Sequence, residues 1–207
     1  MEVLCIPVGP LQANCYLVDD GHGTACILDP GGEPERLVRA LEERELDLVQ
    51  VLLTHGHFDH MAGTAQLAER TGARVGCSPY VKQMIEDPDR FLLFPGFEGI
   101  PGHTPEQLLE DGQQVPVGEL IFTTVATPGH GPGDLTFAAG NALFCGDLLF
   151  YRSIGRTDFP GGDHATLLAS VRRLSELFPP ETVVYPGHMQ PTTLGAEILS
   201  NPFLEGM

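Results

Sequence analysis

The stretch THGHFDH, residues 54–60, places three histidines and one aspartate within six positions, directly after the apolar run Val49–Leu53. Alternate residues of an extended segment point to the same side, so His55 and His57 can bind one metal ion. Asp59 and His60 then turn toward a second ion. Four residues of ligand type at this spacing predict a metal centre rather than surface histidines or an Asp59 helix cap.

Three further sequence segments carry a single ligand-type residue each. His130 lies in TPGHGPGD, Asp147 in FCGD and His188 in YPGH. Each segment follows an apolar run and contains glycine, which lets the backbone turn tightly and approach an ion. Because the ligands of one metal centre must converge from separate strands, these three loops are predicted to complete the site.

The hydrophobic pattern around these motifs alternates between strands and helices. Short β-rich runs predict strands at Val3–Val8, Asn14–Val18, Ala25–Leu28, Val49–Leu53, Leu120–Ala126, Leu135–Ala138, Ala142–Cys145 and Thr182–Tyr185. Helical spacing predicts helices that span Ala62–Arg70, Tyr80–Glu86 and Leu194–Leu199. It also predicts one helix that begins at Pro34 and one that follows an Asp163 cap. Two successive blocks of strands and helices predict an α/β fold in which two packed sheets are covered by helices, four layers in all. We expect residues 1–207 to form a single domain.

Composition and charge exclude several classes of partner. The chain has 11 basic and 28 acidic residues, a net charge of −17, and no basic stripe, which disfavours nucleic acid. The longest apolar runs fall far short of the roughly 18 residues that a membrane span needs. Because the N-terminus has no basic and apolar leader pattern, we expect a cytoplasmic protein whose partners are small molecules. The oligomeric state is left open.

The five cysteines are odd in number and far apart. They predict buried thiols rather than a disulfide framework. Cys145 lies two positions before Asp147, and we interpret it as a packing residue because the carboxylate already supplies a ligand.

These motifs give the sequence a family resemblance that covers nearly the whole chain. It resembles the metallo-β-lactamase fold hydrolases and, within them, the short glyoxalase II-like (hydroxyacylglutathione hydrolase-like) proteins. The resemblance rests on NCYLV, ILDPGG, LLTHGHFDH, TPGHGPGD, FCGDLLF, GRTDFPGGDH, YPGH and NPFL. It implies a four-layer αββα sandwich of two mixed β-sheets, with metals at one edge. The implied ligands are His55, His57 and His130 for one ion, Asp59, His60 and His188 for the other, and Asp147 as the bridge.

The resemblance also implies a reaction, namely metal-dependent hydrolysis of a small thioester such as S-lactoylglutathione by a hydroxide that bridges two divalent ions. Zinc is the expected metal, with iron or manganese as alternatives. Asp59 would orient the hydroxide as a catalytic residue, or would serve as a ligand only. The larger glyoxalase II enzymes carry a C-terminal helical domain that binds glutathione, and the resemblance includes no counterpart of it. The thiol carrier is therefore left open. Gly131 and Asp134 replace the usual residues beside His130, which changes the surroundings of this ligand.

Two other activities share this pattern. Persulfide dioxygenases keep similar HxHxDH and GRTDF motifs but bind one iron through two histidines and an aspartate, which makes a mono-iron oxidoreductase the alternative function. A β-lactamase is disfavoured because many of those enzymes have a cysteine in place of Asp147.

Further residues are candidates for binding the substrate or supporting the metal ligands. Tyr151, Arg152 and Arg156 follow Asp147 and could hold a substrate carboxylate, although Arg156 could instead pair with Asp158 or Asp163. Asp29 could accept the ring N–H of a metal-bound histidine, or simply form a turn. The segment Pro88–Pro105 is apolar without clean periodicity, and a lid, a contact surface and plain core all fit its residues Phe91, Leu92, Leu93, Phe94 and Phe97.

Overall fold

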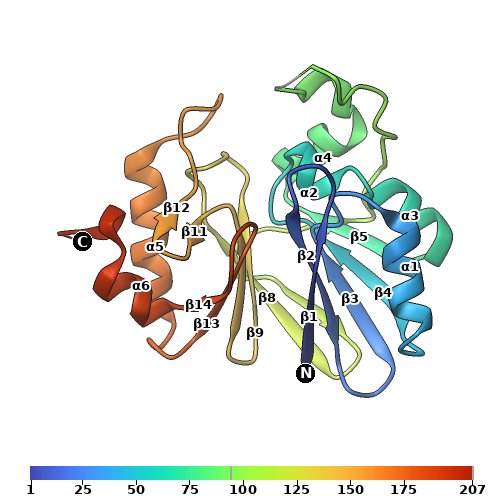
Figure 1. Cartoon of the computed structure of the whole chain (residues 1–207), viewed down its shortest axis with the longest axis horizontal. Helices are drawn as coiled ribbons and strands as arrows, with labels where there is room; N and C mark the ends of the chain where they lie inside the picture. Colours follow the sequence, from blue (N-terminus) through green and yellow to red (C-terminus); the bar gives the residue numbers. More distant parts are fainter. Residues whose placement is uncertain (94, 207) are drawn as a thin grey trace.

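The computed structural model describes residues 1–93 and 95–206, and two six-stranded mixed sheets form its centre (Figure 1). The first sheet has the order β1-β2-β3-β4-β5-β6, with β1 to β3 antiparallel and β3 to β6 parallel. Its strands are β1 (Glu2–Val8), β2 (Ala13–Asp19), β3 (Thr24–Leu28), β4 (Asp47–Leu52), β5 (Arg74–Cys77) and β6 (Gln107–Leu108).

The second sheet has the order β14-β13-β10-β9-β8-β7, and only its β10–β13 pair is parallel. Its strands are β7 (Gln114–Val117), β8 (Leu120–Ala126), β9 (Leu135–Ala139), β10 (Ala142–Gly146), β13 (Val183–Pro186) and β14 (Thr192–Thr193). A separate two-stranded ribbon joins β11 (Leu149–Phe150) to β12 (Ser153–Ile154).

Helices cover the outer faces of both sheets (Figure 1). The helical segments are α1 (Pro34–Glu42), α2 (Phe58–Met61), α3 (Thr64–Thr71), α4 (Pro79–Glu86), η1 (Pro88–Phe91), α5 (His164–Leu177), α6 (Leu194–Ser200) and η2 (Pro202–Leu204). The buried faces of α1, α3 and α4 share one apolar cluster with the first sheet, and those of α5 and α6 share another with the second. The predicted αββα sandwich is confirmed.

Strand β2 shows why the interior has three apolar layers. Cys15 and Leu17 belong to the cluster under the first helix layer, whereas Tyr16 and Val18 belong to the cluster between the sheets. Successive side chains of a strand point to opposite faces, so a strand that is covered on both sides is apolar throughout. This explains why the central strands read as continuous apolar runs.

Aromatic side chains fill the layer between the sheets. Phe122, Phe137 and Phe144 are each among the largest fully buried side chains. The Phe144 ring packs edge-on against Tyr16 of the opposite sheet, with 5.5 Å between the ring centroids. These contacts hold the two sheets together and fix how their strand ends meet.

The helix that was predicted at Ala62–Arg70 is present as α3, Thr64–Thr71, and a short helix that was not predicted, α2, precedes it. The chain forms two helices here, α2 and α3, separated by Ala62 and Gly63. The Gly63 amide donates to the Pro30 carbonyl oxygen at 2.8 Å, and a Cβ on Gly63 would lie 2.8 Å from that oxygen. This close approach bends the chain and gives Asp59 and His60 a short helix of their own.

Several short strands were not predicted, including β5, β6 and β7. Each spans four residues or fewer, too short for alternation to stand out. The Asp163 cap is confirmed, since its side chain accepts a hydrogen bond from the Thr166 amide at 2.7 Å. The cysteines are free thiols, and only Cys5 is not fully buried.

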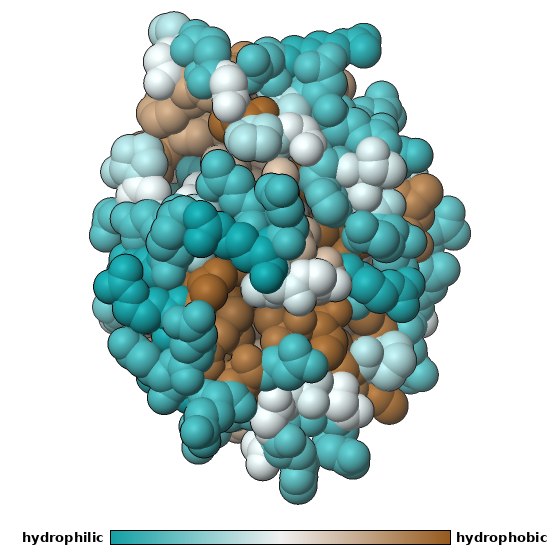
Figure 2. Space-filling view, turned by 90° about the vertical axis from the view of Figure 1, so that its right-hand side faces the viewer, coloured by the Kyte–Doolittle hydropathy of each residue, from teal (hydrophilic) through white to brown (hydrophobic). Residues whose placement is uncertain are grey.

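The outer surface is mostly polar. Figure 2 views the molecule from the side of α1 and α3, where hydrophilic residues dominate and apolar side chains show between them. Among the described residues, no helix is long and apolar enough to cross a membrane.

Neighbouring positions on β8 allow a test of the layer between the sheets. Phe122 is completely buried, whereas the side chain of Ile121 points outward and is 53% exposed. We expect Phe122→Ala to lower the free energy of unfolding by about 3–5 kcal/mol, measured by urea denaturation. Ile121→Ala is the matched control and should change it by less than about 1 kcal/mol; equal losses would contradict this packing.

Candidate metal centre

The predicted ligands meet where strand ends of the two sheets come together. His55 and His57 follow β4 directly, and Asp59 and His60 lie in the short helix α2. His130, Asp147 and His188 follow β8, β10 and β13. The Leu135 amide donates to the Thr54 carbonyl oxygen at 2.8 Å and so ties the two sheets beside the site.

The side chains form two clusters of potential ligands. In the first cluster, His55, His57 and His130 place one ring nitrogen each within 4.8 Å of the others. In the second cluster, Asp59, His60 and His188 do the same with a carboxylate oxygen and two ring nitrogens. Each cluster has the donor types and spacing that a divalent transition metal requires.

Asp147 lies between the two clusters. Its Oδ1 is 3.4 Å from His60 Nε2, and its Oδ2 is 3.6 Å from His130 Nε2 and 3.7 Å from His188 Nε2. One carboxylate therefore faces both clusters, which is the arrangement that a bridging ligand needs.

Asp29 organises the layer behind the ligands. Its Oδ2 lies 3.1 Å from His60 Nδ1 and accepts a hydrogen bond from the Thr54 hydroxyl at 2.6 Å, while Oδ1 accepts from the Thr54 amide at 2.8 Å. A carboxylate only accepts, so His60 Nδ1 carries the proton. Since the Thr54 hydroxyl gives its hydrogen to Asp29, it accepts from His55 Nδ1 at 3.0 Å.

These hydrogen bonds leave the other ring nitrogens free for a metal. His55 Nε2, His60 Nε2 and Asp147 Oδ1 are buried and have no hydrogen-bond partner in the protein. Unpaired buried polar atoms are costly, and a bound cation would satisfy these. Asp29, His55 and His60 also form a third compact group, but its facing atoms are already used in hydrogen bonds.

In His130, too, a hydrogen bond at one ring nitrogen leaves the other nitrogen available to a metal. Its Nδ1 donates to the carbonyl oxygen of Arg156 at 2.8 Å, and its Nε2 faces His57 Nδ1 at 2.8 Å. His57 therefore offers Nδ1 to the first cluster, whereas His55 and His130 offer Nε2.

Protonation differs between the clusters. Burial and the neighbouring imidazoles lower the pKa of His55 well below its usual value and that of His57 to about 3, so both rings are neutral, as ligation requires. Burial also disfavours a charged His60, but the carboxylates of Asp147, Asp59 and Asp29 outweigh it and raise its pKa to about 10. The second cluster thus favours a positive charge.

Asp59 is a carboxylate at neutral pH. Burial alone would raise its pKa, but His60 and His188 overcome this effect and hold the pKa at about 2. Asp59 lines the cavity that opens onto the clusters, so it can act on a bound molecule as an anion.

Two residues that the sequence analysis gave no role fix the His188 loop. The Asn14 side chain donates to the Pro186 and Met189 carbonyl oxygens at 2.9 and 2.7 Å, and the Tyr16 hydroxyl donates to Pro186 O at 2.7 Å. They belong to the NCYLV motif, which was noted only as a resemblance. The available signal was the polar Asn14 at the start of an otherwise apolar predicted strand.

Glycines let the ligand loops pack against one another. A Cβ on Gly31 would lie 1.5 Å from the Asp59 carbonyl oxygen, and one on Gly187 would lie 2.2 Å from Asp147 Oδ1. Any larger residue at either position would displace a ligand.

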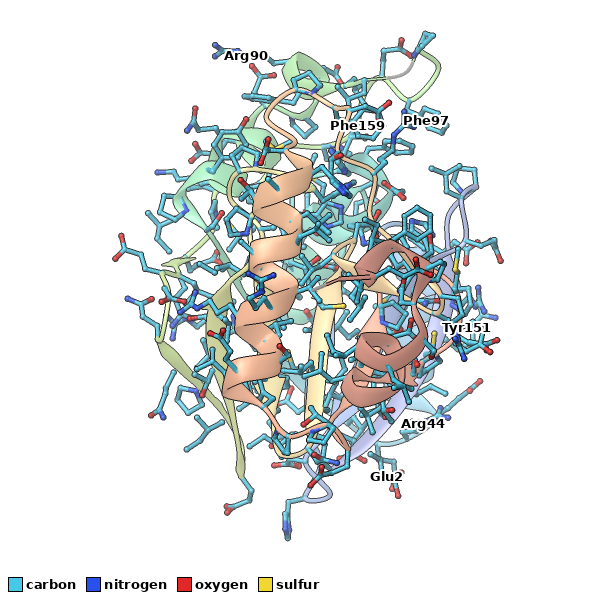
Figure 3. All side chains as sticks on the ribbon, turned by 90° about the vertical axis from the view of Figure 1, so that its left-hand side faces the viewer. Glu2, Arg44, Arg90, Phe97, Tyr151 and Phe159 are labelled. Atoms are coloured by element: carbon cyan, nitrogen blue, oxygen red, sulfur yellow. The ribbon has the colours of Figure 1, made fainter. Side chains whose placement is uncertain are left out.

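The three predicted substrate residues separate in the structure. Arg156 lines the cavity, but it pairs with Asp158 through two hydrogen bonds of 2.6 and 2.7 Å. Tyr151 and Arg152 are not among the described residues that line the cavity, and Figure 3 shows Tyr151 well away from Phe159. The Arg152 guanidinium instead donates to the carbonyl oxygen of Ser200 at 2.6 Å.

The apolar segment of residues 88–105 forms part of the cavity wall. Phe91, Leu92 and Leu93 line the cavity, and the Phe97 ring stacks on Phe58 with 4.3 Å between centroids. Phe94, which was grouped with them, lies outside the described residues. The described apolar members are partly exposed rather than buried core, and Figure 2 shows apolar side chains near the top, where this segment lies.

Comparisons with known proteins agree with this architecture. The profile described as "Metallo-beta-lactamase superfamily" matches residues 8–188. The chain is 38% identical to the hydroxyacylglutathione hydrolase GloC of Haemophilus influenzae, over 99% of this chain and 98% of GloC.

Two solved structures are also closely similar. The B3 metallo-beta-lactamase BLEG-1 shares 36% identity with a TM-score of 0.93, over 99% of this chain and 100% of BLEG-1. TTHA1623 in a di-iron-bound form shares 42% identity with a TM-score of 0.87, over 98% of this chain and 100% of TTHA1623.

Asp147 and Cys145, two residues apart, allow a matched test of the metal centre. Asp147→Ala removes the carboxylate that faces both clusters, so we expect metal content after purification to fall by at least one ion per chain. Cys145 packs in the apolar layer of the second sheet, so Cys145→Ala should keep the full metal content. Elemental analysis measures both, and a metal loss confined to the cysteine variant would refute the ligand assignment.

The hydroxyl of Thr54 provides a test of the supporting layer. Thr54→Val keeps the shape but removes the hydroxyl that links Asp29 to His55, so metal affinity should fall about 10- to 100-fold. Thr54→Ser retains the hydroxyl and should bind metal within about threefold of wild type. Competition with a chromogenic chelator measures both affinities, and equal affinities would exclude this role.

Proposed function

The chain belongs to the metallo-β-lactamase superfamily, and from this premise we propose that it is a dinuclear metal-dependent hydrolase of small thioesters. S-Lactoylglutathione or a related acyl thioester is the proposed substrate class. The similarity to a hydroxyacylglutathione hydrolase over nearly the whole of both chains supports this choice of bond.

One observation carries the proposal. Six potential ligands form two clusters of three, and both oxygens of a seventh, Asp147, face these clusters at 3.4 to 3.7 Å from their ring nitrogens. Asp59, His60 and His188 lie beside the His55, His57 and His130 set and provide the donors for a second ion.

The chemistry follows from the charges and surfaces of the site. Two bound divalent ions would supply a water of lowered pKa, near 7, and a Lewis acid for the carbonyl oxygen. Asp59 is ionised and lines the cavity, so it can accept a hydrogen bond from the attacking water and orient its lone pair toward the carbonyl carbon. No nucleophilic serine or cysteine is required, and a thiolate can leave without a proton donor because thiol pKa values are only about 8.5.

Aromatic rings border the ligands and limit access of bulk water. The Phe159 ring lies 5.3 Å from the His57 ring, and the Phe150 ring lies 6.1 Å from the His188 ring, centroid to centroid. Such a border lowers the local dielectric and strengthens the electrostatic interactions with a developing oxyanion.

A mono-iron persulfide dioxygenase is the second candidate. The similar TTHA1623 was solved in a di-iron-bound form, which keeps iron among the metals to be tested. The pair of clusters bridged by Asp147 favours two ions and hydrolysis over one iron and oxygen chemistry.

Metal analysis combined with three assays distinguishes these functions. We expect about two ions per chain, hydrolysis of S-lactoylglutathione or another acyl thioester, and no oxygen uptake with glutathione persulfide. Removal of metal by a chelator should abolish hydrolysis, and zinc or the native metal should restore it. One tightly bound iron with oxygen uptake and no thioester cleavage would reverse the proposal, and cleavage of a β-lactam alone would replace it.

A further inference from the structure

The cavity in front of the metal clusters is walled largely by apolar side chains. It has a volume of about 550 Å³, and its residues beyond the ligands include Phe58, Met61, Phe150, Ile154, Phe159 and Met189. The segment of residues 91–93 adds a phenylalanine and two leucines. A charged ligand group placed against such a surface contributes little binding free energy, whereas an apolar group contributes much.

The cavity has little capacity to bind a carboxylate through the protein itself. Arg156 is the only lysine or arginine among the described residues that line it. Its Nε and one terminal nitrogen donate to the two oxygens of Asp158, at 2.7 and 2.6 Å, and the guanidinium lies 3.9 Å from the centre of the Phe159 ring. This bidentate pair offsets the charge of Arg156 and occupies the Nε–Nη2 edge of its guanidinium, one of the edges through which an arginine binds a carboxylate.

The apolar wall is held in place beside the ligands. Phe97 stacks on Phe58, the neighbour of Asp59, with an interplanar angle of 28°. Further along the segment, the His103 amide donates to the Ile85 carbonyl oxygen at 2.9 Å. Residues 97 and 103 are therefore attached to α2 and α4, and Phe91, Leu92 and Leu93 line the cavity where a bound molecule would contact them.

We propose that this site selects thioesters by an apolar group that packs against Phe91, Leu92 and Leu93, and that it does not recognise the carboxylates of a glutathione-type carrier. The inference rests on the proposed thioester hydrolysis and narrows its substrate class. The apolar group belongs either to the acyl part or to the thiol part, because both flank the scissile bond.

The first test varies chain length and carrier independently. Acyl groups from acetyl to hexanoyl are joined either to N-acetylcysteamine, which is uncharged, or to glutathione, and a third series lengthens an alkanethiol on a constant acetyl group. We expect kcat/KM to rise roughly fourfold per methylene in the acyl or the alkanethiol series.

The series in which kcat/KM rises identifies the side of the scissile bond that carries the apolar group. Glutathione esters should be cleaved no faster than their uncharged counterparts. Rates that change less than twofold across both length series, or a tenfold preference for glutathione, would overturn the inference.

Ligand binding separates failure of this inference from failure of the proposed function. S-Alkyl-N-acetylcysteamine thioethers cannot be hydrolysed, so calorimetric titration of the metal-loaded protein with them reports binding alone. If no thioester is cleaved, the proposed reaction is wrong, and affinity that still rises with alkyl length shows that the apolar selection is correct. Affinity that does not depend on alkyl length overturns the selection whatever the enzyme hydrolyses.

Two variants test the residues themselves. Leu92→Ser should reduce the gain per methylene from about fourfold to less than twofold, whereas Leu199→Ser, on the outside of α6 and 87% exposed, should leave it unchanged. Asp158→Ala releases Arg156, so the KM for glutathione esters should fall about tenfold while that for N-acetylcysteamine esters stays constant. An unchanged ratio between carriers in Asp158→Ala, or an unchanged chain-length gain in Leu92→Ser, would contradict these roles.

Discussion

The carboxylate of Asp29 is the interaction on which the metal centre depends. It accepts hydrogen bonds from the amide and hydroxyl of Thr54 and from the ring of His60, all in the buried interior. Through the Thr54 hydroxyl it also sets the protonated nitrogen of His55. Because each imidazole has one donor and one acceptor nitrogen when neutral, fixing the proton at Nδ1 aims Nε2 toward the ion. One side chain thereby orients a ligand of each cluster.

This network requires the strand ends to approach more closely than ordinary side chains allow. Gly31 lies against the backbone of Asp59, and Gly187 lies against Asp147 and His60. The Gly187 amide also donates to Gly146 O at 2.7 Å, which joins the loop of His188 to the loop of Asp147. The glycine-rich motifs therefore allow the ligand loops to approach one another, because glycine has no side chain. The packed rings of Phe122, Phe137 and Phe144 hold the two sheets together.

The sequence was sufficient to predict the layers and the convergence of the ligand loops, because apolar runs and the HxHxDH spacing are local signals. It was not sufficient for the break between α2 and α3, which arises from the long-range contact of Gly63 with Pro30. Asp29 was predicted either to accept a histidine ring N–H or to form a turn, and the structure shows both: its Oδ2 lies 3.1 Å from His60 Nδ1, and its backbone turns with a φ of 52°. For Arg156 the sequence left two roles open, an ion pair with a nearby aspartate and binding of a substrate carboxylate. The structure shows the ion pair with Asp158, which sequence spacing alone does not distinguish from the other role.

The structure builds its reactive centre and its cavity wall from different parts of the chain. The ligands come from loops that join both sheets and are constrained by buried hydrogen bonds, so a substitution among them affects the whole centre. Most of the wall comes from residues 88–93 and from the stretch between Phe150 and Phe159, which contribute no predicted ligand. Surface segments of this kind tolerate change more readily than buried strand ends. A single metal centre of this fold can therefore serve different substrates when only the wall varies, which is why chemistry and substrate preference must be argued from separate residues.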